Sequence, residues 1–122
     1  MASWAAAWGE PRAAERRRLV ERAWEQGPVA YAHPPHAGAG HDEILAMIED
    51  FQQRRPGHRI VTTGPAEIVH GWLRATWAVL GPGDVTVLQG VTVTELADDG
   101  RMRRVVDFWG LLPPGSEARL DG

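Results

Sequence analysis

The first half of the chain carries apolar side chains at the spacing of helices. From Pro11 to residue 26 they repeat near the helical period, and a second stripe of this kind runs from 42 to 54. Gly27-Pro28 and Pro56-Gly57 follow these two stripes, and such pairs end helices. Together with a short alanine-rich segment at 2–8, the pattern predicts three helices before residue 57.

Beyond residue 58 apolar and polar residues alternate instead, which is the period of a strand. A shorter strand is predicted at 29–33, because Pro34-Pro35 cannot donate to a ladder and would end it, and residues 36–40 are expected to form a loop. Turn-forming residues divide the alternating region into segments that an antiparallel meander would join. The predicted segments are 58–69 with a bend at Gly64-Pro65, 72–80, 85–96 and 101–109.

This order of elements predicts an α+β fold in which a curved antiparallel sheet wraps around N-terminal helices. With 122 residues the chain is expected to form one domain, 1–122, with room for one core and a small pocket. A net charge of −3 argues against general nucleic-acid binding. No apolar run approaches the roughly 20 residues of a membrane span, and the N-terminal segment lacks a signal-peptide pattern, so we expect a cytoplasmic protein without membrane contact.

The stretch 31-YAHPPHAGAGHDEI-44 gathers three of the five histidines, and the chain has no cysteine. A metal site would need His33, His36 and His41, but prolines and glycines separate them and nothing in the spacing makes their rings converge. Asp42 suits the first turn of the following helix. We therefore expect no metal ligands here, with His33 turned inward and the other two histidines exposed to solvent.

Four short motifs occur in an order that resembles the nuclear transport factor 2-like superfamily, in its SnoaL-like and ketosteroid-isomerase-like branch. The resemblance spans nearly the whole chain. It implies a cone-shaped half barrel, a pocket between sheet and helices, no cofactor, and commonly a homodimer through the outer face of the sheet. The motifs are Tyr31-Ala32-His33-Pro34, Gly40-His41-Asp42-Glu43-Ile44, Asp99-Gly100-Arg101 and Asp107-Phe108-Trp109-Gly110-Leu111-Leu112.

The resemblance also implies where the site lies. The general base of ketosteroid isomerases is the acid of Y-x-D-P, where this chain has His33, and their second acid corresponds to Thr92. Steroid isomerisation is therefore not expected. SnoaL-like cyclases instead use the Asp of a D-x-x-G-L-L motif, which matches Asp107. An aromatic residue near the end of the last strand lines the family pocket, and Trp109 matches it.

Strand alternation extends this assignment, because residues two apart share a face. Counting back from Trp109 places Asp107 on the pocket face, and Trp77 faces inward in a regular hairpin. The predicted catalytic residues are Asp107 and His33. The predicted pocket-lining residues are Tyr31, Trp77, Thr92, Val105 and Trp109.

The chemistry follows from burial. A carboxylate beside Trp77 and Trp109 is partly desolvated, so its pKa rises and it can remove a proton next to a carbonyl near neutral pH. His33 could donate a proton to the enolate oxygen or keep Asp107 ionised. The alternative for Asp107 is a structural carboxylate bonded to backbone or indole N–H groups, and for His33 a residue that caps the strand end.

Three functions remain open at this stage. The first is a small acid–base enzyme of the isomerase, cyclase or dehydratase type, acting on a hydrophobic carbonyl compound. The second is non-catalytic binding of an apolar small molecule, and the third is a dimeric interaction domain. A homodimer is also predicted because helices can cover only one face of the sheet. The residues expected on the uncovered face are Val85, Val87, Val91 and Val93.

Overall fold

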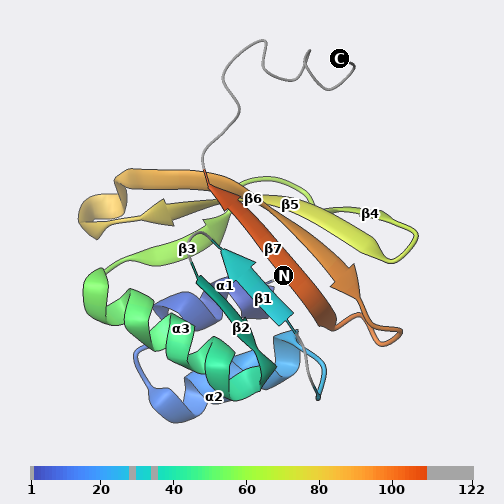
Figure 1. Ribbon diagram of the computed structural model, residues 1–122. Helices are drawn as coiled ribbons and strands as arrows, with labels where there is room; N and C mark the ends of the chain where they lie inside the picture. Colours follow the sequence, from blue (N-terminus) through green and yellow to red (C-terminus); the bar gives the residue numbers. More distant parts are fainter. Residues whose placement is uncertain (1, 28–29, 34–35, 110–122) are drawn as a thin grey trace.

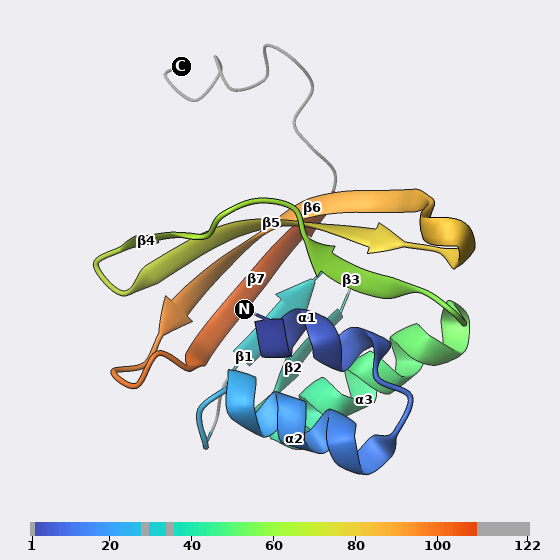
Figure 2. The ribbon, with the colours of Figure 1, turned by 180° about the vertical axis from the view of Figure 1, so that it is seen from behind.

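The computed structural model describes residues 2–27, 30–33 and 36–109 (Figures 1 and 2). Its helices are α1 (Ala2–Gly9), α2 (Ala13–Ala23) and α3 (Gly40–Arg54), with a short 3-10 turn η1 at Pro82–Asp84. Its strands are β1 (Ala30–His33), β2 (His36–Ala39), β3 (Arg59–Thr62), β4 (Glu67–Val69), β5 (Trp72–Leu80), β6 (Thr86–Leu96) and β7 (Met102–Trp109).

One open sheet contains all of these strands, in the order β2-β1-β7-β6-β5-β3, with β4 also paired to β5. Every pairing is antiparallel except that of β1 with β7, which is parallel. Both ribbon views place the three helices together against one face of the curved sheet (Figures 1 and 2). The predicted α+β half barrel is confirmed. None of the described helices is long and apolar enough to cross a membrane.

The segment 36–40 was predicted as a loop, and this was wrong. Residues 36–39 form β2, which pairs antiparallel with β1 from Ala30 opposite Ala39 to His33 opposite His36. Pairing supplies partners for backbone groups that a loop at this place would leave unsatisfied. Gly38 allows the close approach to α3, since a Cβ there would lie 2.8 Å from the sulfur of Met47.

The bend expected within 58–69 divides that segment into two strands. β3 and β4 both pair antiparallel with β5, and Gly64-Pro65 lies between them. His70 and Gly71 form the following turn, both at positive φ. Alternate residues of β5 and of β6 lie on the inner face of the sheet, as the sequence pattern predicted.

Large side chains fill the space between this inner face and the helices. The fully buried core includes Trp4, Trp24, Tyr31, Ile44 and Ile48. Each such side chain contributes roughly 1.5–3 kcal/mol by leaving water. Trp72 and Trp109 differ from the other tryptophans because each is 47% exposed.

Polar contacts fix the helices to one another. The side-chain amide of Gln52 in α3 donates to the carbonyls of Trp8 at 3.1 Å and Glu10 at 2.8 Å, which anchors the end of α1. His41 was expected to be exposed, but it is half-buried, and its Nε2 lies 2.8 Å from the carbonyl of Glu25. Asp42 lies in the first turn of α3 as predicted.

Gly90 occupies the centre of the inner face, opposite Trp77 on β5 and Trp109 on β7. A Cβ at this position would lie 2.3 Å from the carbonyl oxygen of Phe108 and 2.3 Å from Cζ2 of Trp77. The indole of Trp77 therefore lies directly on the bare backbone of β6.

We expect Gly90→Ala to lower the free energy of unfolding by about 1–3 kcal/mol, because the added methyl group overpacks the sheet. Gly64→Ala is the matched control, since its Cβ would make only an ordinary contact, 3.5 Å from Oγ1 of Thr76. Urea denaturation of both variants measures the difference. Equal stabilities would show that the close packing of Trp77 on Gly90 is not a constraint on the fold.

Candidate functional site

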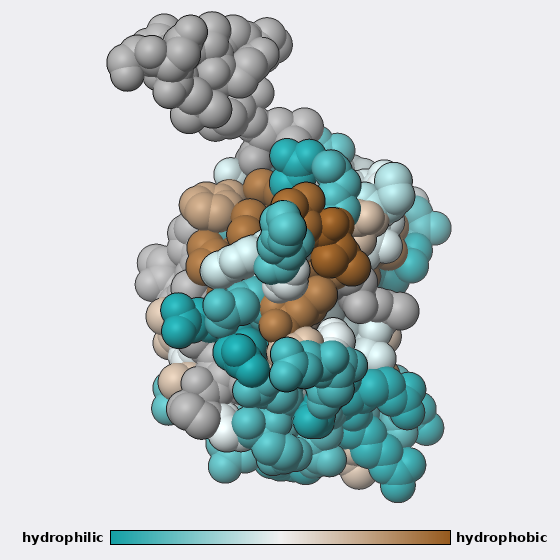
Figure 3. Space-filling model, turned by 90° about the vertical axis from the view of Figure 1, so that its right-hand side faces the viewer, coloured by the Kyte–Doolittle hydropathy of each residue, from teal (hydrophilic) through white to brown (hydrophobic). Residues whose placement is uncertain are grey.

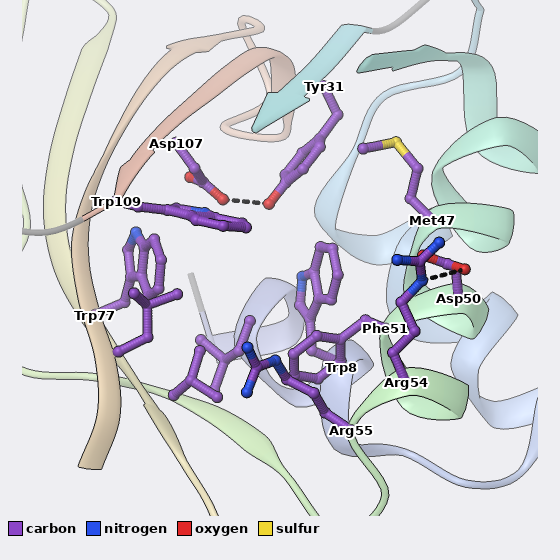
Figure 4. A pocket seen from close by; sticks show the side chains of 13 residues that line it. Trp8, Tyr31, Met47, Asp50, Phe51, Arg54, Arg55, Trp77, Asp107 and Trp109 are labelled. Atoms are coloured by element: carbon purple, nitrogen blue, oxygen red, sulfur yellow. Dashed lines mark hydrogen bonds and ion pairs between the residues drawn. The ribbon is translucent and has the colours of Figure 1, made fainter. Parts of the chain in front are cut away.

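A cavity of about 300 Å³ lies between the inner face of the sheet and the helices (Figure 4). Its walls are mostly apolar, with Trp8 from α1, Phe51 from α3 and Trp77 from β5. Tyr31 and Asp107 form a polar end at the sheet. The volume is at the lower end of the range for small-molecule pockets.

Asp107 is 3% exposed, although it is a charged residue type, and its two oxygens differ. Oδ2 accepts a hydrogen bond from the hydroxyl of Tyr31 (Figure 4). Oδ1 is buried and has no hydrogen-bond partner among the described residues. A buried acceptor without a partner is costly, so this free oxygen needs an explanation.

The parallel pairing of β1 with β7 brings Tyr31 to Asp107. Tyr31 pairs with Val105, two positions before Asp107, and its long side chain reaches the carboxylate on the same face. Trp8 and Trp24 hold the tyrosine ring, with ring centroids at 5.6 Å and 5.8 Å. The hydroxyl is therefore fixed in place before any ligand binds.

Burial controls the charge of this pair. It raises the pKa of Asp107 from 3.8 to about 6, although the hydrogen bond from Tyr31 and the nearby hydroxyl of Thr92 act in the opposite direction. Thr92 lies across the strand pair from Asp107, but its hydroxyl makes no hydrogen bond of ordinary geometry. Burial and the charge of Asp107 also raise the pKa of Tyr31 well above its usual value. Tyr31 therefore stays protonated while Asp107 titrates near neutrality.

The structure places the predicted site residues at different depths. Tyr31, Trp77, Asp107 and Trp109 all line the cavity, with Trp109 half-exposed at its rim. Thr92 and Val105 face the same side, but each is fully buried and lies outside the cavity wall, where other side chains cover it.

His33 ends β1, and its backbone pairs with His36. The side chain of His33 lies outside the described part of the structure, as do Gly110, Leu111 and Leu112 of the last motif. The role of His33 therefore stays a prediction. Within the described residues, no group of three or more His, Asp or Glu side chains could hold a metal ion.

Sequence reasoning did not foresee the hydrogen bond between Tyr31 and Asp107. It placed Tyr31 on the pocket face but paired the carboxylate with His33, because a parallel pairing of β1 with β7 was not expected. The helical contributions of Trp8 and Met47 were also missed. Phe51 could have been found, since it belongs to the apolar stripe of α3 that had to face the sheet.

Neither a comparison with protein-family models nor a search of curated protein sequences finds a match. A search of solved structures does. A candidate isomerase of the SnoaL-like family from Agrobacterium tumefaciens str. C58 is 34% identical, over 90% of this chain and 93% of that chain, with a TM-score of 0.82. The chain belongs to the SnoaL-like family.

More distant structures share the fold of this SnoaL-like protein. An NTF2-like protein of unknown function from Exiguobacterium sp. 255-15 is 9% identical, over 91% of this chain and 98% of that chain, with a TM-score of 0.70. A candidate SnoaL-like polyketide cyclase from Jannaschia sp. CCS1 is 16% identical, over 77% and 72%, with a TM-score of 0.62. The nuclear transport factor 2-like fold expected from the motifs is confirmed.

The raised pKa of Asp107 makes the stability of this SnoaL-like protein depend on pH. The folded state holds the carboxyl proton more tightly than the unfolded state, so the stabilising effect is complete below pH 4 and is lost as the pH rises through about 6. The loss amounts to about 2–3 kcal/mol. Asp107→Asn cannot titrate, so we expect the stability of the variant relative to wild type to increase by that amount between pH 4 and pH 7. Thermal unfolding across this range measures the difference, and a constant difference would contradict the raised pKa.

Proposed function

We propose that this protein performs cofactor-free acid–base chemistry on a hydrophobic carbonyl compound, of the isomerase, cyclase or dehydratase type, with Asp107 as the general base. One observation carries the proposal. A buried carboxylate at the polar end of an apolar cavity has one oxygen bound by Tyr31 and the other free, and its pKa is raised to about 6. A base of this pKa is largely ionised at neutral pH and still binds a proton strongly enough to remove one from carbon.

The two carboxylate oxygens of Asp107 have different roles in this proposal. Oδ1 removes a proton from the carbon next to the carbonyl: the C–H bond breaks, its electron pair moves toward the carbonyl oxygen, and the proton stays on Oδ1. Tyr31 keeps its hydrogen bond to Oδ2 and holds the carboxylate in one orientation. Return of the proton to another carbon gives isomerisation. In a cyclisation the enolate carbon attacks a second carbonyl of the same substrate, the π pair of that carbonyl moves onto its oxygen, and the proton goes to that oxygen. Transfer of the proton to a departing hydroxyl releases water and gives dehydration.

The walls of the cavity indicate the kind of substrate. Trp8, Phe51 and Trp77 offer aromatic surfaces, and Tyr31 and Asp107 form a polar end at the sheet. The charged residues Asp50, Arg54 and Arg55 line the cavity apart from that end (Figure 4). A compact, largely apolar molecule with one carbonyl group at its polar end matches this distribution. A proton-donating role for His33 remains part of the proposal, based on its place at the end of β1 beside β7.

The proposal is tested with 2-acetylnaphthalene in D2O, where removal of a methyl proton appears as deuterium uptake in the NMR spectrum. We expect wild type to accelerate the exchange, with a rate that rises through pH 6 and then levels as Asp107 ionises. Asp107→Asn should lower the enzymatic rate by about 10²–10⁴-fold, which is the usual contribution of a general base.

Asp50→Asn is the matched control, because it makes the same substitution at another carboxylate that lines the cavity. Asp50 is paired with Arg54 at 3.0 Å, on the α3 side of the cavity (Figure 4). We expect this variant to keep the exchange activity. If Asp107→Asn exchanged as fast as wild type, Asp107 would not be the base. Tight binding of the ketone by wild type without any exchange would favour a non-catalytic binding protein.

We also propose that the chain forms a homodimer through the outer face of its sheet. The helices cover only the inner face, and the outer face exposes Trp72, Val106 and Phe108 by 40–52%. Val91 and Val93 lie between them on β6, opposite Phe108 and Val106. Seen from the side, apolar surface gathers at the level of the sheet and hydrophilic surface covers the helices below (Figure 3). Exposed aromatic residues of this kind are typical of the centres of interfaces.

Sedimentation at micromolar concentration should give twice the 13.4 kDa mass of the chain. Phe108→Glu should produce monomers, since a charge would be buried without a partner at the interface. Arg22→Gln on the exposed face of α2 changes the net charge by the same amount and should leave the dimer intact. A monomeric wild type would rule out the dimer.

A further inference from the structure

The indole of Trp77 carries a hydrogen-bond donor that the fold does not use. Trp77 is 3% exposed, and its Nε1 is buried without a hydrogen-bond partner among the described residues. A buried N–H in this state is destabilising unless a ligand or water completes it. The side chain of Trp77 is one of those that line the cavity that also contains Asp107.

The orientation of this indole is fixed by the sheet. Trp77 lies opposite Gly90, and the positions Cζ2 and Cε2 of its ring would lie 2.3 Å and 2.7 Å from a Cβ on Gly90. The edge of the ring next to Nε1 therefore packs on the backbone of β6. Figure 4 shows the indole nitrogen at the end of the ring nearest Trp109 and Asp107. A donor held by packing does not need to be reorganised when a ligand binds.

Two residues that line the same cavity thus carry an unused donor and an unused acceptor. Oδ1 of Asp107 and Nε1 of Trp77 each lack a partner among the described residues, so they are not bonded to each other. On the inner face, Trp77, Gly90 and Trp109 form one cross-strand row, and Thr92 and Asp107 belong to the next row. A carbonyl group with an acidic neighbouring C–H bond needs both functions: an acceptor for the proton and a donor for the oxygen.

We propose that the Nε1–H of Trp77 binds the carbonyl oxygen of the substrate and stabilises the negative charge that forms there, an inference that rests on Asp107 being the base. When Oδ1 takes the proton, the C–H electron pair forms a C=C bond and the carbonyl π pair moves onto oxygen. The indole keeps its own proton and donates a hydrogen bond to that oxygen throughout. Trp77 then determines which carbonyl compounds react: the carbon that loses the proton must be directly attached to the carbonyl that Trp77 holds.

The test removes the donor without changing the shape of the ring. Replacing Trp77 with benzothienylalanine puts sulfur in place of the N–H, and Trp77→Phe is a second variant made by ordinary mutagenesis. Trp72→Phe is the control, because it removes an indole N–H from the outer face of the same strand. The probes are 2-acetylnaphthalene and 2-isopropylnaphthalene, which have similar shapes but differ in the carbonyl oxygen.

We expect the benzothienyl variant to bind the ketone about 5–10-fold more weakly, as for the loss of one hydrogen bond. Its affinity for the hydrocarbon should not change, and its deuterium exchange rate should fall by about 10²-fold, as for the loss of one donor to an oxyanion. In wild type, the indole Hε1 resonance of Trp77 should move downfield when the ketone binds and should not do so with the hydrocarbon.

The results separate this inference from the proposed function. Loss of exchange in Asp107→Asn but not in either Trp77 variant would overturn the role of Trp77 and leave Asp107 as the base. If wild type does not exchange deuterium into the ketone, the proposed catalysis is wrong. The affinities for the two probes and the Hε1 shift would then still decide whether Trp77 binds the carbonyl oxygen. An Hε1 shift of equal size with both probes, or no binding of the ketone, would overturn the inference.

Discussion

The hydrogen bond from Tyr31 to Asp107 connects the two parts of the structure on which the site depends. It joins β1, which the helices support, to β7, which ends the antiparallel part of the sheet. Burial opposes the charge on Asp107, and the hydroxyl of Tyr31 offsets only part of that effect, so the carboxylate remains a stronger base than an exposed aspartate. The same interaction therefore links β1 to β7 in the core and affects how basic the carboxylate at the polar end of the cavity is.

This arrangement costs stability. A neutral side chain in place of Asp107 would avoid the desolvation of a charge. Apolar packing at this end of the cavity would remove Oδ1 of Asp107 and the indole N–H of Trp77, which lack partners among the described residues. Trp77 adds a second constraint, because it requires Gly90 beneath it, and glycine weakens the interior of a strand. Two local weaknesses at the same end of one cavity are typical of a functional site, where function opposes stability.

Much of this site could be predicted from alternation along the strands. Residues two apart share a face, so assigning Trp109 to the pocket also placed Asp107 and Val105 on the inner side, where the structure has them. The pairing of β1 with β7 could not be predicted in this way. The partners lie more than 70 residues apart in sequence, and β1 and β2 are too short to show a period. The same limit hid β2, since the pattern of Pro and Gly around it also suits a loop. It also hid the hydrogen bond from Tyr31 to the carboxylate, while the role predicted for His33 stays a prediction.

The neutral side chain at residue 92 suits the buried carboxylate that it faces. Thr92 and Asp107 are a cross-strand pair, fully buried on the same face. The ketosteroid-isomerase pattern has an acid at the position of Thr92, but in this chain such an acid would face the carboxylate of Asp107 directly. Two carboxylates in that position could not both ionise, and the pKa of one would be strongly raised. Under the proposed function, the neutral residue at 92 leaves Asp107 as the only carboxylate of this pair. In the proposed mechanism, neutral donors such as the indole of Trp77 stabilise the charge on the substrate, and they do so without competing with Asp107 for a proton.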